Sequence, residues 1–407
     1  MTERRHPGTA LWILPMTRRR ALWSAFGGAV LLGTAGCGGR ASNEPTTVPT
    51  AALTPTPTQE AIGNEIASPI AGYLNPQRWV GRTLTVTSAG SREYKDAQAE
   101  AFLDAFAAAT GATVQQKITD IGQLKNQVEN GTVTWDVVDV PTEEVIPLSR
   151  ADFLTPIDYR QVDISTVFPA EIAMQYGVGF ALFSTVIVFP AAAQQVPTGW
   201  QDFWSVGAFG EGRALRKSPV GTMEFALIAD GVAPTRDALY PLDVPRAFAS
   251  LDRIKPYVSS WYEDGKQPVE LVLSGQVGLA SAWNVRADIL EDPDAVALQW
   301  NGGMLSGQSW VVPRGTQNED VAMDFINFAT RAAPSANFAR LVPFGPVNLD
   351  ALALLRPDRR ALLPNADPHR ELQFVENWNY WADNVEGLTE QFNAWLLQET
   401  ESATPEP

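Results

Sequence analysis

Side chains that commonly carry out catalysis or bind metal are scarce in this sequence, apart from carboxylates. Its 407 residues include two histidines, His6 and His369, and one cysteine, Cys37. His6 lies in the expected leader segment, so His369 would be alone in the mature chain, which excludes a multi-histidine metal site, and a Ser-His-Asp triad would have to use His369 itself. The sequence contains no GxGxxG, GxxxxGK[S/T] or HExxH motif. We therefore predict no metal and no cofactor, and carboxylate pairs remain the possible source of catalysis.

Acidic and tryptophan side chains are abundant instead. The chain has 46 acidic and 30 basic residues, a net charge of −16, and 13 tryptophans. A negative field repels nucleic acid and anionic membrane surfaces and attracts cations. Tryptophan offers a flat surface that stacks on sugar rings, methylene chains or cations. The composition excludes nucleic acid as an expected partner, although a solvated acidic surface and an aromatic core would explain it equally well.

The single cysteine follows a short apolar run. Residues 21–35, "ALWSAFGGAVLLGTA", carry no charge and are too few for a membrane span, which suits an export signal. Residues 17–20, "TRRR", resemble the start of a twin-arginine signal, and residues 34–37, "TAGC", resemble a bacterial lipobox. We expect the thiol of Cys37 to be acylated and to attach the protein to a membrane. Translation could start at Met1 or at Met16.

The chain then divides into segments of different composition. The stretch "EPTTVPTAALTPTPTQE" is rich in Pro and Thr without an apolar period, which predicts an extended tether. We predict the following organisation: an export signal with lipobox over 1–37, a disordered tether over 38–82, lobe 1 over 83–189 plus 310–345, lobe 2 over 190–309, a C-terminal helical segment over 346–398, and a disordered tail over 399–407.

Strand and helix patterns alternate in the first lobe. Strands are predicted at 83–88, at "ATVQQKI" and at 135–140, with an amphipathic helix over 96–110 ended by Gly111 and a second helix capped by Asp120. Alternation of this kind predicts a parallel sheet covered by helices.

The rest of the chain repeats the pattern. We predict a strand at 181–189, a helix capped by Asp243, a crossing strand at "QSWVVP", and helices over 318–329 and 388–397. The predicted fold class is α/β, with two lobes joined by extended crossings and a cleft between them.

Several ordered segments resemble one protein family. They are "FLDAFAAATGATV", "WDVVDV", "VPTGWQDFWSVGAFGEGRAL", "LYPLDVPRAFASLDRIKP", "LSGQVGLASAW" and "WVVPRGTQNEDVAMDFINF". Their order is similar to that in extracellular solute-binding proteins of ABC importers, in the branch that includes spermidine/putrescine receptors. The resemblance implies a periplasmic-binding-protein-like clamp that closes on a small solute and docks on a permease with its ATPase, outside the cytoplasmic membrane, with no catalysis.

The resemblance also implies site residues. Polyamine receptors cage their ligand with aromatic rings and carboxylates, and Trp283 matches a cage tryptophan, with Val285 where glycine is usual. In "MLSGQSWVVP" the family's aromatic residue falls on Ser306 and its aspartate on Gln308. These two side chains offer hydrogen bonds rather than charge, which suits a smaller or less charged solute than a polyamine.

Four further candidates follow from the loops and from nearby helices. Glu143 stands in the first contact loop, Tyr94 follows the loop "SAGS", and Glu224 lies near the position of a family acid pair. Trp261 is the fourth candidate. Each of Glu143, Glu224 and Trp261 could instead be solvated or structural.

Two other functions compete with transport. An anchored hydrolase such as a glycosidase would use a pair of carboxylates, of which the chain has many. A sensor or adhesion module could share the same fold. The predicted function is a lipid-anchored ABC-importer receptor for a polyamine-like or other small polar or cationic solute.

Overall fold

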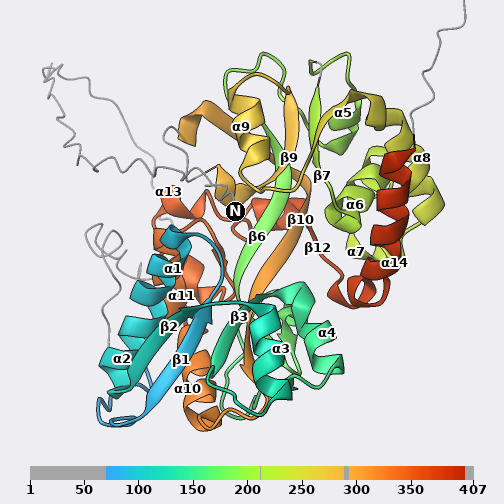
Figure 1. Cartoon of the computed structure of the whole chain (residues 1–407). Helices are drawn as coiled ribbons and strands as arrows, with labels where there is room; N and C mark the ends of the chain where they lie inside the picture. The colour runs from blue at the N-terminus through green and yellow to red at the C-terminus, as the bar shows by residue number, and fades with distance from the viewer. Residues whose placement is uncertain (1–69, 211, 288–292, 399–407) are drawn as a thin grey trace, which may run out of the picture. The chain divides into compact units, whose positions relative to one another are not determined.

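One mixed sheet runs through both lobes of the computed structural model, which describes residues 70–210, 212–287 and 293–398. The strand order is β2-β1-β3-β10-β6-β9-β7-β8. Two long strands, β6 (Gly177–Pro190) and β10 (Val296–Pro313), pair with each other and cross from one lobe to the other (Figure 1). The predicted α/β fold with two lobes and extended crossings is confirmed.

Lobe 1 has helices on both faces of a mixed sheet, in which β1, β2 and β3 are parallel, as predicted, but β10 runs antiparallel to β3. Its strands and helices are β1 (Thr83–Ser88), α1 (Arg92–Gln98), α2 (Ala105–Thr110), β2 (Thr113–Ile118), α3 (Ile121–Glu129), β3 (Val137–Pro141), α4 (Val145–Arg150), β4 (Leu154–Thr155), β5 (Ala173–Met174), α10 (Glu319–Ala329), α11 (Ala332–Leu341), β11 (Gly345–Pro346), α12 (Asp350–Ala353) and α13 (Pro357–Arg360). A π-helical turn over 99–104 joins α1 to α2. As predicted, Gly111 ends α2 with a positive φ of 77°, and the side chain of Asp120 caps α3.

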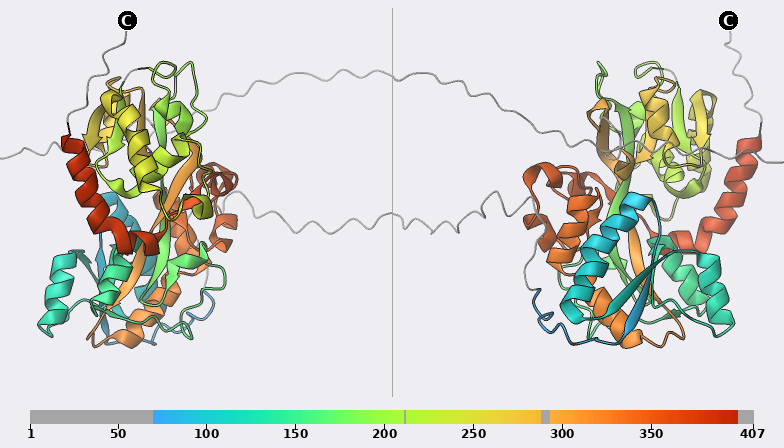
Figure 2. Two further views of the ribbon diagram at one scale, coloured as in Figure 1. Left: turned by 90° about the vertical axis from the view of Figure 1, so that its right-hand side faces the viewer. Right: turned by 60° about the vertical axis from the view of Figure 1, so that its left-hand side comes forward.

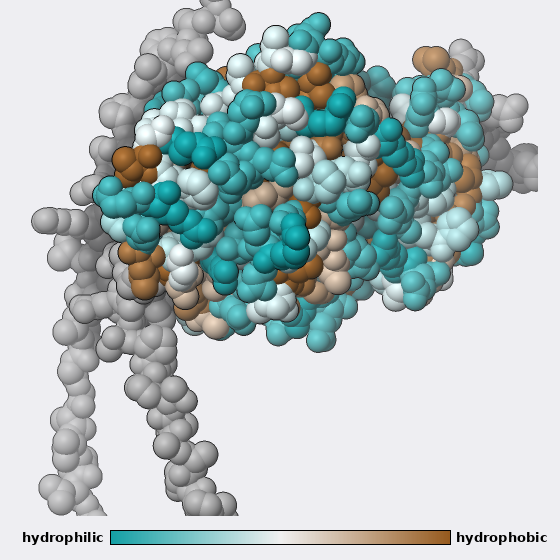
Figure 3. Space-filling view, turned by 90° about the horizontal axis from the view of Figure 1, so that it is seen from below, coloured by the Kyte–Doolittle hydropathy of each residue, from teal (hydrophilic) through white to brown (hydrophobic). Residues whose placement is uncertain are grey.

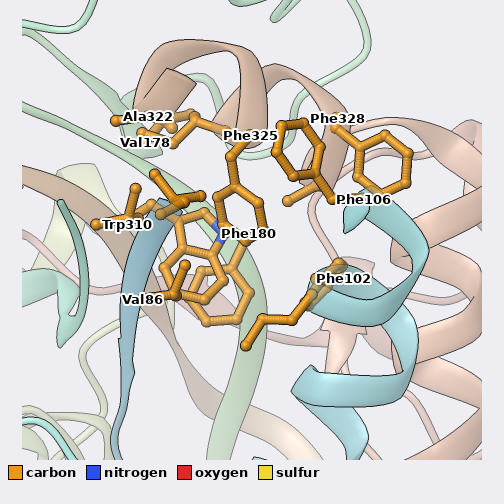
Figure 4. Close-up of a cluster of buried hydrophobic side chains, with 14 of the residues drawn as sticks. Val86, Phe102, Phe106, Val178, Phe180, Trp310, Ala322, Phe325 and Phe328 are labelled. Carbon is orange, nitrogen blue, oxygen red and sulfur yellow. The ribbon is translucent and has the colours of Figure 1, made fainter. Parts of the chain in front are cut away.

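Aromatic rings fill the core of lobe 1 (Figure 4). Phe180 of β6 stacks on Trp310 of β10 with ring centroids 4.0 Å apart, so the two crossing strands are joined by ring contact as well as by hydrogen bonds. Phe102 and Phe325 meet Trp310 edge-on at 6.2 Å and 5.6 Å. Edge-on and offset contacts of this kind stabilise beyond the area that they bury.

Lobe 2 repeats the layered arrangement. Its elements are α5 (Trp200–Trp204), β7 (Arg213–Arg216), α6 (Pro219–Ala229), α7 (Arg236–Leu239), α8 (Val244–Ile254), β8 (Val258–Tyr262), α9 (Gln267–Leu273), β9 (Leu279–Trp283), β12 (Phe374–Val375) and α14 (Trp378–Leu397). Asp243 caps α8 as predicted. Alternating residues of β6 face opposite layers, since Ile187 packs with α6 and α8 whereas Val186 and Val188 pack with α9.

The lobe boundaries differ from those predicted. The second half of β6 belongs to the lobe 2 core, so the boundary in this strand lies between Ala181 and Ile187 rather than after residue 189. Residues 346–398 do not form a separate segment. Ala351, Leu355 and Leu363 pack with α11 of lobe 1, whereas α14 lies along α6 in lobe 2 (Figures 1 and 2).

The end of the predicted tether is folded. Residues 70–82 pack against lobe 1, and Tyr73 is buried in its core, so the prediction of an extended chain is wrong for this part. Asp324 of α10 explains the attachment, because it accepts hydrogen bonds from Tyr73 Oη at 3.0 Å and Trp79 Nε1 at 2.6 Å and lies 3.1 Å from Arg78 Nη2. Residues 1–69 and 399–407, with the predicted signal, Cys37, most of the tether and the tail, lie outside the described residues.

The face of the molecule seen from the lobe 1 side is mostly hydrophilic, with small separate apolar patches (Figure 3). Among the described residues, no helix is both long enough and apolar enough to cross a membrane.

Replacing Asp324 with alanine should loosen the attachment of residues 70–82. The substitution removes the acceptor of the half-buried Trp79 indole and the ion-pair partner of Arg78. It also leaves the Tyr73 hydroxyl with only the Asp324 backbone carbonyl as acceptor, 2.8 Å away, so we expect the free energy of unfolding to fall by roughly 1–3 kcal/mol. Urea denaturation measures the change. Asp96→Ala, which breaks an exposed ion pair with Arg92, is the matched control and should cost under about 0.5 kcal/mol. Equal losses in the two variants would contradict this account.

Candidate functional site

A cavity of about 260 Å³ lies between the lobes. Its residues come from both sides of the crossing strands: Ala89, Gly90, Ser91, Glu93, Tyr94, Pro141, Glu143, Val342, Pro343 and Phe344 from lobe 1, Arg216, Val220, Trp283, Val285, Arg286 and Glu376 from lobe 2 and its C-terminal segment, and Phe183, Thr185, Met304, Ser306 and Gln308 from the crossing strands themselves. Pockets for drug-sized ligands usually measure about 300–1,000 Å³. The cavity therefore suits a small solute.

The crossing strands present one face to this cavity. Met304, Ser306 and Gln308 alternate along β10, so their side chains point to the same side of the sheet. On β6, Thr185 pairs with Met304 and Phe183 pairs with Ser306. The pairing shifts between Gln308 and Ser309, which is a bulge where the strand enters lobe 1.

A row of aromatic rings connects the two lobes along the cavity. Trp283, at the end of β9, meets Phe183 edge-on with centroids 5.7 Å apart, and Phe183 lies 6.1 Å from Phe344. Phe344 in turn lies 5.1 Å from Tyr94 in lobe 1. Behind the indole, a Cβ atom at Gly265 would lie 2.7 Å from Trp283, so only glycine leaves the ring this position. The row gives the cavity an apolar wall that suits methylene groups.

Two arginines lie against the tryptophan. The guanidinium carbon of Arg216, at the end of β7, is 5.2 Å from the centroid of Trp283, and that of Arg286 is 5.6 Å away. Both distances are within the range of cation–π attraction. In the described part of the chain, no hydrogen bond or ion pair joins the side chain of Arg216 to another residue, and Nε of Arg286 is buried without a partner. These groups can receive an anionic part of a ligand.

Asp139 of β3 organises the lobe 1 wall. Its Oδ2 accepts hydrogen bonds from Tyr94 Oη at 3.0 Å, Gln98 Nε2 at 3.0 Å and the backbone nitrogen of Ala89 at 3.1 Å. Burial raises the pKa of Asp139 to about 7, although these hydrogen bonds favour its charged form. In the amide orientation that satisfies its neighbours, Gln308 donates to Asp139 Oδ1 at 3.2 Å and to the Val140 carbonyl at 3.0 Å.

Two of the three glutamates that line the cavity, Glu143 and Glu376, interact electrostatically with each other. Glu376 lies between β12 and α14, is 1% exposed, and accepts a hydrogen bond from Ser306 Oγ at 2.6 Å. Burial, together with the negative charge of Glu143, raises the pKa of Glu376 to about 8. Burial also raises the pKa of Glu143, against the opposing effect of Arg216. Both acids and Arg216 therefore share one small space.

The structure brings five of the predicted site residues together. Trp283, Gln308, Ser306, Glu143 and Tyr94 all line the cavity. Ser306 and Gln308 stand where the resemblance expects an aromatic residue and an aspartate. In the structure, Ser306 donates a hydrogen bond to Glu376 and Gln308 donates one to Asp139.

The other two predicted site residues lie elsewhere. Glu224 is buried behind the lobe 2 wall, where its carboxylate accepts hydrogen bonds from the Gly221 backbone nitrogen at 2.9 Å, Tyr240 Oη at 2.5 Å and Trp381 Nε1 at 2.8 Å. It ties the start of α6 to α14. Trp261 packs between Phe392 and Trp395 in the lobe 2 core, with ring centroids 5.8 Å and 5.6 Å away.

Four groups of the cavity were missed by the sequence analysis. Phe344 follows a helix without a motif of its own, and Glu376 is a lone acid in the aromatic stretch "FVENWNYW". Arg216 and Arg286 were missed because the resemblance to polyamine receptors directs attention to carboxylates. One signal was present, since Arg216 stands at the carboxyl end of a strand before a helix, the edge at which α/β sheets bind ligands. Within the described ranges, no cluster of three or more His, Cys, Asp or Glu could hold a metal ion.

The buried Glu224 should make stability depend on pH. Burial raises its pKa to about 7, so its contribution is fully present below the unfolded value near 4.5 and is lost as pH rises through 7. We expect Glu224→Gln to reduce the fall in unfolding free energy between pH 5 and pH 8 by on the order of 3 kcal/mol. Denaturant titrations at both pH values measure this. The exposed substitution Glu270→Gln on α9 should keep the wild-type dependence, and the same result for Glu224→Gln would contradict the assignment.

Comparison with known proteins agrees with this geometry. The sequence model of the bacterial extracellular solute-binding proteins matches residues 101–368. The γ-aminobutyric acid-binding protein of Pseudomonas aeruginosa is 32% identical over 326 residues, which cover 78% of this chain and 92% of that protein.

Solved structures agree as well. A GABA receptor structure is 34% identical with a TM-score of 0.70, covering 78% of this chain and 98% of that one. An ABC transporter substrate-binding protein from Bradyrhizobium japonicum is 31% identical with a TM-score of 0.72, covering 78% of this chain and all of that one.

These relatives are binding proteins rather than enzymes, so the alternative of a hydrolase is set aside. The chain belongs to the bacterial extracellular solute-binding proteins, and it is a substrate-binding protein of an ABC transporter that acts outside the cytoplasm.

Proposed function

We propose that this protein captures a small solute that carries an acidic and a basic group separated by methylene groups, such as γ-aminobutyric acid, for an ABC permease and its ATPase. One observation carries the proposal. Arg216 and Glu143, which have opposite charges, line the same cavity, and no hydrogen bond or ion pair within the described residues joins either side chain to another.

Each end of such a solute finds a matching group. The planar guanidinium of Arg216 can donate two parallel hydrogen bonds to a carboxylate, with Arg286 as a second cation nearby. The carboxylate of Glu143 can accept from an ammonium group. Between these ends, the row from Trp283 to Phe344 provides apolar surface for the methylene groups.

Lobe closure follows from the placement of these groups. Arg216 belongs to lobe 2, whereas Glu143 follows β3 of lobe 1. A solute that contacts both residues binds the closed arrangement more strongly than the open one, and this difference in affinity drives closure. The names of the two γ-aminobutyric acid-binding relatives support the same class of ligand.

A polyamine is the second candidate, because three glutamates, Glu93, Glu143 and Glu376, line the cavity. Spermidine and putrescine carry only positive charges, however, and Arg216 and Arg286 both stand against Trp283, the predicted cage residue. Like charges in a cavity of this size repel strongly. A solute with one positive and one negative end is therefore favoured over a polycation.

We also propose that acylation of Cys37 holds the receptor at the membrane near its permease. The support comes from the sequence, in which an uncharged apolar run precedes the only cysteine and a Pro/Thr-rich stretch follows it. The packed segment from residue 70 onward then attaches this stretch to lobe 1 through Asp324.

Replacing Arg216 with glutamine should weaken the binding of γ-aminobutyric acid. The neutral side chain loses the charge-assisted hydrogen bonds, and we expect the dissociation constant to rise roughly 10- to 100-fold. Isothermal titration calorimetry with γ-aminobutyric acid and, separately, putrescine measures it. Arg246→Gln, which removes a surface arginine paired with Asp230 in the same lobe, is the control and should bind as the wild type does.

Two outcomes would contradict the proposed ligand class. One is tight binding of putrescine without binding of γ-aminobutyric acid, and the other is unchanged affinity for γ-aminobutyric acid in Arg216→Gln.

Replacing Cys37 with serine should release the protein from membranes. The wild type should sediment with membranes and incorporate labelled palmitate, because acyl chains contribute about 0.8 kcal/mol for each buried methylene group. The variant should be found in the soluble fraction with no label. Membrane association that is equal in the two proteins would argue against an anchor at Cys37.

A further inference from the structure

Glu376 differs from the other fully buried carboxylates of the molecule. Its Oε2 accepts from Ser306, but its Oε1 is buried without a hydrogen-bond partner among the described residues, although the residue lines the cavity. Asp139 and Glu224, by contrast, each accept at least three hydrogen bonds from protein groups. A buried charged oxygen without a partner is costly, so a partner from outside the protein is expected.

We propose that Glu376 is a specificity-determining residue of this receptor: its free Oε1 binds the ammonium group of the ligand together with Glu143, and its carboxyl group gives up a proton when the ligand binds. The inference rests on the proposed function only for the presence of an amine in the ligand. The exchange is balanced, because the ligand keeps its ammonium group, the O–H bond of the carboxyl group breaks, and the proton passes to the solvent.

The groups around Glu376 favour its protonated form when no ligand is bound. Negative charge near Glu376 comes from Glu143, in the turn before α4, and from Glu224, at the start of α6. The hydroxyl of Tyr240, which follows α7, also lies near Glu376 but is uncharged. Among the described residues, Arg216 is the cation that acts on Glu376, and Ser306 donates its one hydrogen bond from a side chain. Acids packed this closely in a dry site do not all ionise at neutral pH. The pKa of Glu376, raised to about 8, agrees with this geometry.

An ammonium group changes this balance. Placed against Oε1, it supplies the missing donor and a positive charge, so the ionised form of Glu376 becomes the stable one. A solute without an amine supplies neither and leaves the carboxyl group protonated. Glu376 therefore distinguishes amines from neutral analogues of the same shape, and the affinity for an amine should rise with pH between 6 and 8.

Calorimetry in buffers of different ionisation enthalpy tests the proposal directly. With γ-aminobutyric acid at pH 7, the slope of the observed enthalpy against the buffer ionisation enthalpy should show release of about one proton per bound ligand. In Glu376→Gln the slope should be close to zero, and the affinity should fall roughly 10- to 100-fold and lose its pH dependence. Glu371→Gln, an exposed substitution in the same segment, should behave as the wild type.

The outcomes separate this proposal from the proposed function. Binding of γ-aminobutyric acid without proton release overturns the role of Glu376 and leaves the ligand class intact. If putrescine binds instead, the ligand class is wrong, and the same buffer series with putrescine decides the role of Glu376.

An infrared measurement on the ligand-free wild type tests the proposal even if no ligand is found or if the Glu376→Gln variant folds poorly. Asp139 and Glu224 also have pKa values raised to about 7, so as pH rises the infrared spectrum of the wild type should lose protonated-carboxyl carbonyl intensity near pH 7 and again, from Glu376, near pH 8. A spectrum in which no such intensity is lost around pH 8 would overturn the proposal even if no ligand is found.

Discussion

The cost of burying charge is the constraint on which this structure depends. Several carboxylates lie out of water, and each one must find donors or hold a proton. Asp139 and Glu224 find their donors within the protein, so they act as fixed points for the lobe 1 wall and for the contact between α6 and α14. Glu143, Glu376 and Arg216 do not have a full set of partners, and all three face the cavity between the lobes. The number of hydrogen bonds at each buried charge therefore separates the scaffold from the binding site.

The local parts of the fold could be predicted from sequence because short-range physics determines them. Gly111 ends a helix at a positive φ, Asp120 and Asp243 cap helices, and alternation along β10 places Ser306 and Gln308 on one face. Those signals lie within a few residues of the structure that they specify. The family resemblance, rather than this alternation, is what points to Ser306 and Gln308, and both line the cavity because the period of a strand is two.

Contacts between residues far apart in the chain could not be predicted in this way. The bond from Trp381 to Glu224 joins residues 157 positions apart, and the bond from Tyr73 to Asp324 joins residues 251 apart. These contacts decide that the C-terminal segment divides between the lobes and that residues 70–82 are folded. They also bring Glu376 into the cavity, which no local pattern around "FVENWNYW" indicates. Side chains in such positions are defined by what they meet, and the sequence near them does not contain that information.

The two tryptophan candidates show why residue type alone does not define a site. Trp261 meets only other rings of the lobe 2 core, so its burial contributes to stability. Trp283 has one edge against Phe183 and two guanidinium groups near its ring, in a cavity whose acidic residues come from other segments. Arg216 belongs to lobe 2 and Glu143 to lobe 1, so a solute with two charged ends would connect the lobes. In the proposed function, recognition and closure are consequences of the same arrangement of charge, because a solute that pairs at both ends would bind the closed form more strongly than the open one.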